Sequence, residues 1–149
     1  MDKDLQAQID AFKKKMLEKQ GQVHSKLGEA IAQACNDVQT TAVEGMTNTE
    51  IDTSKRYKRG KNIYHSPSME GAYPAVDTGM LRRSITHTVE YGDDGEVIGK
   101  VGTNLKYGKY LEFGTSRGLR PRPWLKPSLV ENEENIKKRI QDAVKDGMK

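Results

Sequence analysis

The chain has 149 residues, which is enough for one ordinary domain and too few for two. Charged residues make up 31% and aromatic residues 6%, and the mean hydropathy is −0.82, so the core is expected to be modest. A formal net charge of +4 is a mild excess and is not typical of a dedicated DNA-binding domain. Because a secretory signal and a long apolar run are both missing, we expect a soluble, intracellular protein without a membrane span.

Residues 1–44 are expected to form one long N-terminal helix, from about Asp4 to about Glu44. Apolar residues recur at intervals of three, four or seven, which places them in one stripe along a helix. They are Leu5, Ile9, Phe12, Met16, Val23, Leu27, Ala30, Ala34 and Val38. At 1.5 Å per residue this helix would span roughly 60 Å and outreach its domain. A break or bend is expected near Gly21, since glycine costs about 1 kcal/mol in a helix interior.

Residues 45–76 lack periodicity and contain many turn formers, which predicts an extended loop or arm. A short strand is expected from Arg56 to Tyr64, with Tyr57, Ile63 and Tyr64 as its anchors. Five basic residues gather there without an acid between Asp52 and Glu70; they are Lys55, Arg56, Lys58, Arg59 and Lys61. The segment is either a solvated basic loop or a patch that faces a polyanion such as DNA.

Residues 77–149 are expected to form the α+β core. A helical turn begins at Asp77 or Thr78 as N-cap and points Leu81 inward. Alternation of apolar and polar residues from Ser84 to Tyr91 predicts a strand, and the "GDDG" turn and a return strand complete an antiparallel hairpin. A hairpin alone is marginally stable, so it needs a cover.

Two further helices are expected after the hairpin. The first carries Tyr107, Tyr110 and Phe113 at near-helical spacing, stops at Gly114 and covers the hairpin. The last runs from about Leu129 to about Asp146, with acids in its first turns that complement the helix dipole. The predicted fold class is therefore α+β: a long N-terminal helix and a small antiparallel sheet covered by short helices and a C-terminal helix, in a single domain.

Catalytic and metal-binding groups are sparse in the sequence. The three histidines, His24, His65 and His87, show no metal-site spacing, and His87 is interpreted as a partly buried, hydrogen-bonded residue of the strand. The single cysteine, Cys35, is interpreted as a small buried hydrophobe. Gly99 and Gly102 lack the third glycine of a dinucleotide fingerprint, and a bulge or a close backbone approach is the preferred interpretation. We therefore expect no enzyme, no metal and no cofactor.

Three motifs occur in a fixed order through the second half of the chain. The first is "DTGMLRRSI" from Asp77, the second "VGTNLKYGKYLEFGT" from Val101, and the third "RPRPWLKP" from Arg120 to Pro127. Together they resemble the gene-10-like family of tailed-phage head-tail joining proteins, also described as tail completion or neck proteins. The resemblance extends over about 75–144, and the long N-terminal helix agrees with the family layout.

The resemblance implies a non-enzymatic virion protein that forms a ring around the DNA channel, at the neck or the proximal end of the tail. A hexamer is expected, because tail tubes of this phage type commonly have sixfold symmetry. Its partners would be further copies of the chain and other neck and tail proteins, namely the stopper, the tail terminator and the tail tube. A modest core and an over-long helix suit such contacts between subunits.

The segment from Tyr107 to Pro127 is interpreted as a contact surface for a subunit or partner. The predicted interface residues are Tyr107, Tyr110, Glu112, Phe113, Arg117, Arg120, Arg122 and Trp124. We hypothesise an ion pair between Glu112 and one of the arginines, within or between subunits. Trp124 is either a core residue or an anchor in a pocket of the adjacent subunit.

Two other functions are alternatives to the ring subunit. A small basic nucleic-acid-binding protein would use the five basic loop residues and the arginines of 117–122, and its binding to duplex DNA would fall steeply with salt. A small hydrolase is disfavoured by the lack of converging titratable groups.

Overall fold

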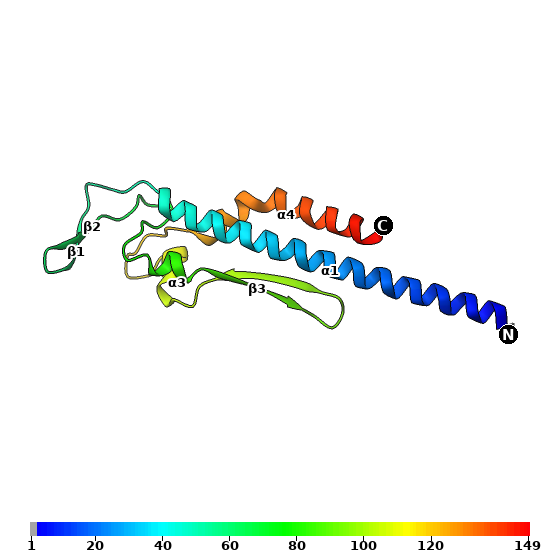
Figure 1. The fold of residues 1–149 in the computed structure, drawn as a ribbon. Helices are drawn as coiled ribbons and strands as arrows, with labels where there is room; N and C mark the ends of the chain where they lie inside the picture. The colour runs from blue at the N-terminus through cyan, green and yellow to red at the C-terminus, as the bar shows by residue number, and fades with distance from the viewer. Residues whose placement is uncertain (1–2) are drawn as a thin grey trace.

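The computed structural model describes residues 3–149, and its central element is α1 (Lys3–Asn48), an unbroken helix of 46 residues (Figure 1). At 1.5 Å per residue it is roughly 70 Å long. The expected break near Gly21 is wrong. Glycine costs only about 1 kcal/mol there, and extending a helix that has already nucleated is cooperative, so one poor residue does not interrupt it.

Two other elements lie on either side of α1 in Figure 1. Helix α4 (Leu125–Met148) packs along one side, and the hairpin of β3 (Thr86–Tyr91) and β4 (Val97–Gly102) packs on the other. Near its end, α4 approaches α1 closely at Gly147. A Cβ atom at this position would collide with the backbone of Val23, so only glycine fits there. The α+β fold class is confirmed, and α1 is the element that both layers share.

The β3–β4 hairpin has the antiparallel pairing that the sequence predicts. Its turn is closed by Gly92, whose N–H donates to the carbonyl of Glu96 at 2.8 Å. His87 is half-buried against α1, and its Nδ1 lies 2.6 Å from Oε1 of Gln39. The interpretation of His87 as a hydrogen-bonded structural residue is therefore confirmed.

The loop after α1 forms a second hairpin, of β1 (Tyr57–Gly60) and β2 (Ile63–His65), which projects beyond the end of α1 (Figure 1). The expectation that Tyr57, Ile63 and Tyr64 anchor this segment is wrong, because all three side chains are exposed. The anchor lies at the root of the hairpin instead. There Ile51 bridges to the buried Ser68, while Pro67 and Pro74 are also buried.

A cluster of buried side chains forms the core where α1, α2 (Met80–Ser84) and the start of α4 meet. It consists of Ala42, Met46, Leu81, Ile85 and Trp124. Leu81 points inward as predicted. The N-cap position itself is taken by Gly79, with φ of 77°, but Oγ1 of Thr78 accepts the N–H of Met80 at 3.3 Å, as the sequence predicts for one of the two candidates. The carboxylate of Asp77 is instead paired with Arg59.

Within residues 3–149, no helix is both long enough and apolar enough to cross a membrane.

Substitution of Gly99 by alanine is expected to lower the free energy of unfolding by about 1–3 kcal/mol. A Cβ atom at this position would overlap the Sγ of Cys35 and lie 2.7 Å from Cγ2 of Ile31. Gly102→Ala in the same strand is the matched control, because a Cβ there meets nothing within 4 Å. Urea unfolding measures both, and equal stability of the two variants would contradict the close packing of β4 on α1.

Candidate functional site

Helix α3 (Lys106–Phe113) and the proline-rich segment after it form an elbow between the β3–β4 hairpin and α4. Gly114 ends α3 with φ of 74°, and its N–H donates to the carbonyl of Tyr110 at 2.8 Å. The prediction that Gly114 stops this helix is confirmed. Thr115 then donates to the carbonyl of Leu119 at 3.0 Å, which folds the tip of the elbow back on itself.

Glu112 caps the N-terminus of α4. One carboxylate oxygen accepts the N–H groups of Trp124 at 2.7 Å and Leu125 at 2.9 Å, and the other accepts that of Lys126 at 2.9 Å. These N–H groups have no partner inside their own helix, and a negative charge near them also complements the helix dipole. Among residues 3–149, Glu112 makes no ion pair with an arginine. The hypothesised pair within the chain is therefore wrong, because α4 uses both carboxylate oxygens.

The cap also corrects the expected start of α4. The helix begins at Leu125, so the acids at 131–134 lie beyond its first turn, which contains no acidic residue of its own. Pro127 is accommodated within that first turn, where its missing N–H leaves no hydrogen bond unmade. The negative charge at the N-terminus of α4 therefore comes from Glu112 of α3, and not from the acids of α4 that the sequence pattern predicts.

Trp124 is a core residue and not an exposed anchor. Only 3% of its surface is accessible, and its indole N–H donates to the carbonyl of Gly108 at 2.9 Å. Glycine is needed at position 108 for the close packing of α3, because a Cβ atom there would lie 2.6 Å from Cγ2 of Thr103 and 3.2 Å from Cδ1 of Leu81. The structure therefore selects the core alternative for Trp124.

Arg122 is likewise buried and joins the elbow to the long loop. Its Nε donates to the carbonyl of Ser68 at 3.2 Å, and its backbone N–H donates to the carbonyl of Leu111 at 2.7 Å. Beside it, the N–H of Gly71 donates to the carbonyl of Pro121 at 3.2 Å. Arg122 thus holds three segments together, and its guanidinium is not a surface group.

The remaining predicted contact residues form the outer surface of the elbow. Tyr107, Tyr110, Phe113, Arg117 and Arg120 are all exposed, and 73% of the Phe113 surface is accessible. The prediction that the three aromatic residues cover the β3–β4 hairpin is wrong, because that hairpin packs on α1. The α3 residue that packs on the core is Leu111. The exposed aromatic side chains therefore have no cover within residues 3–149.

An apolar hollow of about 480 Å³ lies next to these aromatic residues, and we call it the terminal hollow. Its lining includes Met46, Pro74, Met80, Tyr107 and Leu111. Ser68 also lines it; this side chain is 1% exposed, and its hydroxyl has no hydrogen-bond partner in the described chain. A buried polar group without a partner is costly, so an occupant that hydrogen-bonds Ser68 would be favoured.

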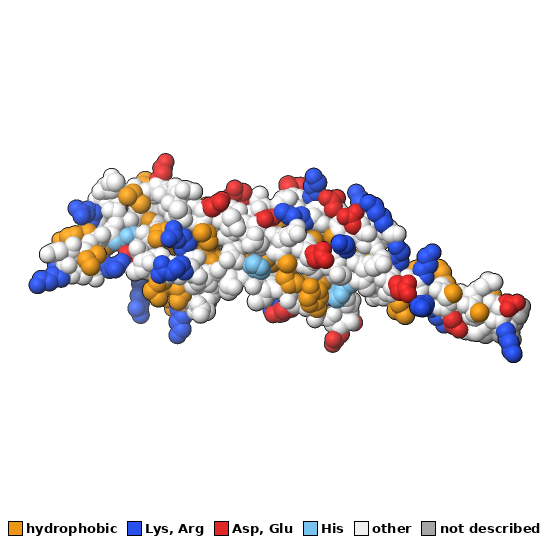
Figure 2. Space-filling model, viewed as in Figure 1, with side chains coloured by type: hydrophobic (Ala, Val, Ile, Leu, Met, Phe, Trp, Pro, Cys, Tyr) orange, Lys and Arg blue, Asp and Glu red, His pale blue; other side chains and the backbone are white. Residues whose placement is uncertain are grey.

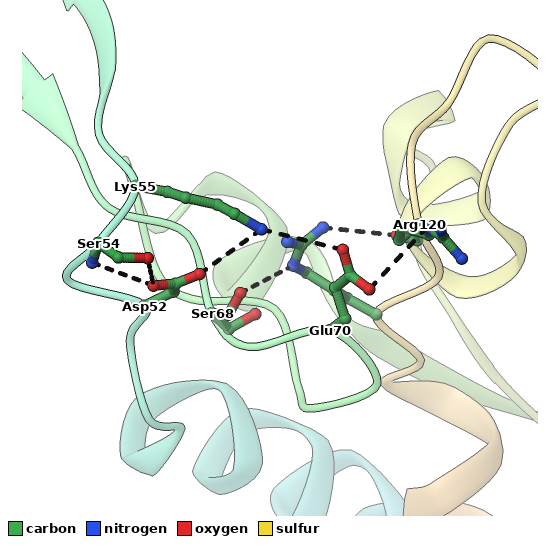
Figure 3. Close-up of polar contacts among 7 residues, drawn as sticks. Asp52, Ser54, Lys55, Ser68, Glu70 and Arg120 are labelled. Carbon is green, nitrogen blue, oxygen red and sulfur yellow. Dashed lines mark hydrogen bonds and ion pairs between the residues drawn. The ribbon is translucent and has the colours of Figure 1, made fainter.

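The five basic residues of the loop have different surroundings. Lys55 lies 3.6 Å from a carboxylate oxygen of Asp52 and 3.9 Å from one of Glu70, and Glu70 also reaches Arg120 at 4.0 Å (Figure 3). The hydroxyl of Ser54 donates to Asp52, which lowers the pKa of that carboxyl below its ordinary value. This network connects the root of the β1–β2 hairpin to the elbow.

The hairpin itself carries the other four basic residues. Arg59 pairs with Asp77, and the guanidinium of Arg56 lies 4.8 Å from the ring centre of Tyr64. Lys58 and Lys61 are exposed, and neither has an acidic partner in the described chain. Two of the five predicted DNA-facing side chains are therefore fully available to a polyanion.

Basic side chains gather at this end of the molecule, as Figure 2 shows. The loops, α2 and the elbow, residues 49–85 and 103–124, contain twelve basic and five acidic residues. The β3–β4 hairpin, residues 86–102, has four acids and one lysine. The mild net charge of the chain thus conceals a strong separation of charge.

Groups capable of catalysis are not brought together in the described residues. Burial raises the pKa of the Cys35 thiol, which packs beneath the β4 strand at Gly99. No group of three or more histidine, cysteine, aspartate or glutamate side chains in 3–149 is arranged to hold a metal ion.

Sequence reasoning missed two residues that matter at this end of the chain. The sequence gives only a weak signal that Glu112 is a cap. The signal is that a helix starts without a capping side chain of its own and that an acid lies twelve residues before its N-cap residue, Trp124. Ser68 has no signal, because its burial depends on the bridge between Ile51 and the segment after β2.

Comparisons with known proteins give one family match. A family model described as "Bacteriophage HK97-gp10, putative tail-component" matches residues 1–114. This range includes α1, both hairpins and α3, and it ends at Gly114, before the "RPRPWLKP" motif and α4. No curated protein and no solved structure matches the chain.

Replacing Glu112 with alanine is expected to lower the free energy of unfolding by about 1–2 kcal/mol, because three N–H groups lose their acceptor. Glu134→Ala removes the same charge from an exposed position in α4 and is the matched control. Chemical denaturation followed by circular dichroism measures both variants. If Glu112→Ala is no less stable than Glu134→Ala, the cap does not stabilise the elbow.

Proposed function

Because this chain belongs to the HK97-gp10-like family of phage tail components, we propose that it is a ring-forming head-tail joining subunit of the virion. The ring would lie at the neck or the proximal end of the tail and surround the DNA channel. Family membership places the chain among structural tail proteins of the virion, whose partners are other tail proteins. The ring, the hexameric stoichiometry and the position at the neck are parts of the proposal.

The observation that carries the proposal is the position of the uncovered apolar surfaces. At one end of α1, Leu5, Phe12 and Met16 are exposed. At the other end lie the terminal hollow and the exposed aromatic residues of α3. Because the uncovered surfaces at the two ends of the rod differ from each other, contacts between copies are expected to join unlike surfaces, and such heterologous contacts close into a ring when the rotation between subunits allows it.

The terminal hollow and the elbow are the surfaces that we assign to other tail proteins, such as the stopper, the tail terminator or the tail tube. Phe113 and Tyr110 would be buried in that contact, while the buried Trp124, Arg122 and Glu112 would hold the elbow in shape. In this proposal these three residues do not contact the partner and instead hold the contact surface in its conformation.

Contact with DNA is a second candidate function for the β1–β2 hairpin. Lys58 in β1 and Lys61 at the turn of this projecting hairpin are exposed and lack acidic partners in residues 3–149, which is the specific observation in its favour. In a ring, such hairpins would line the channel or its rim and make sequence-independent contacts with phosphates. The same side chains would be the main binding groups if the chain were a separate nucleic-acid-binding protein.

Phe113→Ser is expected to weaken association with neck or tail partners at least about tenfold, because an exposed aromatic side chain at an interface is a typical hot spot. Its stability should be unchanged, since the residue is mostly exposed. Val130→Ser, an exposed apolar residue of α4, is the control. Negative-stain images and light scattering of the chain with its partners report ring formation. A strict monomer that never joins a virion would overturn the proposal.

Replacement of both Lys58 and Lys61 by glutamine is expected to weaken binding to duplex DNA. The slope of log K against the logarithm of the salt concentration should fall in magnitude by about 2. Lys138→Gln with Lys145→Gln removes the same charge from α4 and should leave binding unchanged. Fluorescence anisotropy over a salt series measures both. If the unmodified chain does not bind at low salt, or if both pairs behave alike, the hairpin does not contact DNA.

A further inference from the structure

The N-terminal part of α1, residues 3–20, extends past the rest of the molecule, and we call it the arm (Figure 1). Helix α4 ends beside Val23, and only its last residue, Met148, shares a hollow with the root of the arm at Met16 and Leu17. Leu5, Ile9, Phe12 and Met16 are spaced by four, three and four and therefore share one face of the arm. Phe12 is 65% exposed, so the arm presents an apolar face that the described chain does not cover.

A matching surface lies halfway along the molecule, between β4 and α4, and we call it the central groove. It has a volume of about 250 Å³, and all nine residues that line it are apolar or glycine. Its floor is α1 around Ala34 and Val38, one wall is β4 at Val101, and the other is α4 at Leu129 and Ile136. Leu129 is 52% exposed, which is high for a leucine beside a core.

We propose that the arm of one copy of this chain lies in the central groove of a second copy. The arm cannot reach the groove of its own chain, because both belong to the same continuous helix and residues 3–20 point away from the groove floor at 31–38. A second copy removes this restriction. The arm of the second copy would pack against α1, β4 and α4 of the first. This contact would bury the apolar face of the arm and the lining of the central groove.

Charge distinguishes the central groove from the terminal hollow as the site for the arm. The arm has five lysines and three acids, so it is basic. The end that holds the terminal hollow is strongly basic and would repel it, whereas the β3–β4 hairpin has four acids and one lysine. On α4, Glu133 and Glu134 pair with Lys137, so the complementary charge comes from the hairpin. The basic arm therefore complements the hairpin side of the central groove.

This contact is heterologous, because each copy contributes an arm on one side and a groove on the other. It would pass from copy to copy until it closes, which gives a ring or, without closure, a filament. The inference rests on the proposed ring for its biological setting, and the contact itself can be tested without it.

The experiment uses two lysine substitutions with matched controls. Phe12→Lys places a charge on the apolar face of the arm, and Leu129→Lys places one in the wall of the groove. The controls are Leu17→Lys, in the arm but off that face, and Val130→Lys, next to Leu129 on α4. All four side chains are at least half exposed, so the variants are expected to fold, which thermal unfolding verifies.

Sedimentation velocity of the full-length chains gives the readout. Phe12→Lys and Leu129→Lys alone should each weaken self-association about tenfold or more, while both controls should assemble like the unmodified chain. Mixing Phe12→Lys with Leu129→Lys should restore one intact contact, from the arm of the second variant to the groove of the first. The mixture should therefore give a one-to-one heterodimer and nothing larger.

Other outcomes overturn the inference. If arms pair with arms, Phe12→Lys alone is defective and the mixture yields no heterodimer. If the unmodified chain stays monomeric at high concentration, or if Leu17→Lys is as damaging as Phe12→Lys, the arm does not bind the groove. Rings that persist in Phe12→Lys would overturn the contact and leave the proposed ring intact. A heterodimer from variants whose parent forms filaments would support the contact and contradict the ring.

Discussion

A single helix of 46 residues determines how much of this protein can be covered by its own chain. The apolar stripe of α1 begins at Leu5 and continues to the core at Met46, a distance of roughly 60 Å at 1.5 Å per residue. Helix α4 has 24 residues and covers about half of that length, and the β3–β4 hairpin covers less. The remaining apolar face of α1 is therefore available only to another molecule. This geometric shortage, and not a catalytic group, is the feature that points to assembly.

The elbow depends on an interaction between two helices, in which a side chain of α3 accepts the unpaired N–H groups at the start of α4. Glu112 of α3 satisfies the first N–H groups of α4, and the side chain of Trp124 at this junction returns a hydrogen bond to Gly108 of α3. Each helix thus fixes the start or the packing of the other. Arg122 then attaches the long loop at Ser68. Because this junction holds α3 in place, the partner contact that we propose for its exposed surface would require little rearrangement.

Features set by neighbouring residues were predictable from the sequence. The stop at Gly114, the turn at Gly92 and the alternation in β3 all depend on backbone preferences within a few residues, and the structure confirms them. The location of α1 was also predictable, because its periodicity repeats many times. The predictions that are wrong depend on contacts between residues distant in sequence. Near-helical spacing of Tyr107, Tyr110 and Phe113 identifies a helix face but not whether that face meets the core, and here Leu111 does so instead.

The candidate site shows the same limit. Composition located the basic hairpin, but only the structure shows that Asp52, Glu70 and Asp77 pair with Lys55 and Arg59 and leave Lys58 and Lys61 without acidic partners. A count of charges treats all five basic residues alike. Their pairing depends on acids brought from both ends of a folded loop.

Separation of charge along the rod gives its surfaces different preferences for neighbours. Apolar burial stabilises contacts but hardly distinguishes one apolar surface from another. The basic arm, the acidic β3–β4 hairpin beside the central groove and the basic end with the terminal hollow add this discrimination. If the arm of one copy lies in the central groove of the next, as we propose, like charges keep the arm away from the terminal hollow and leave that surface for an acidic partner. The proposed contact would then join copies in one direction and leave the other end for further components of a tail.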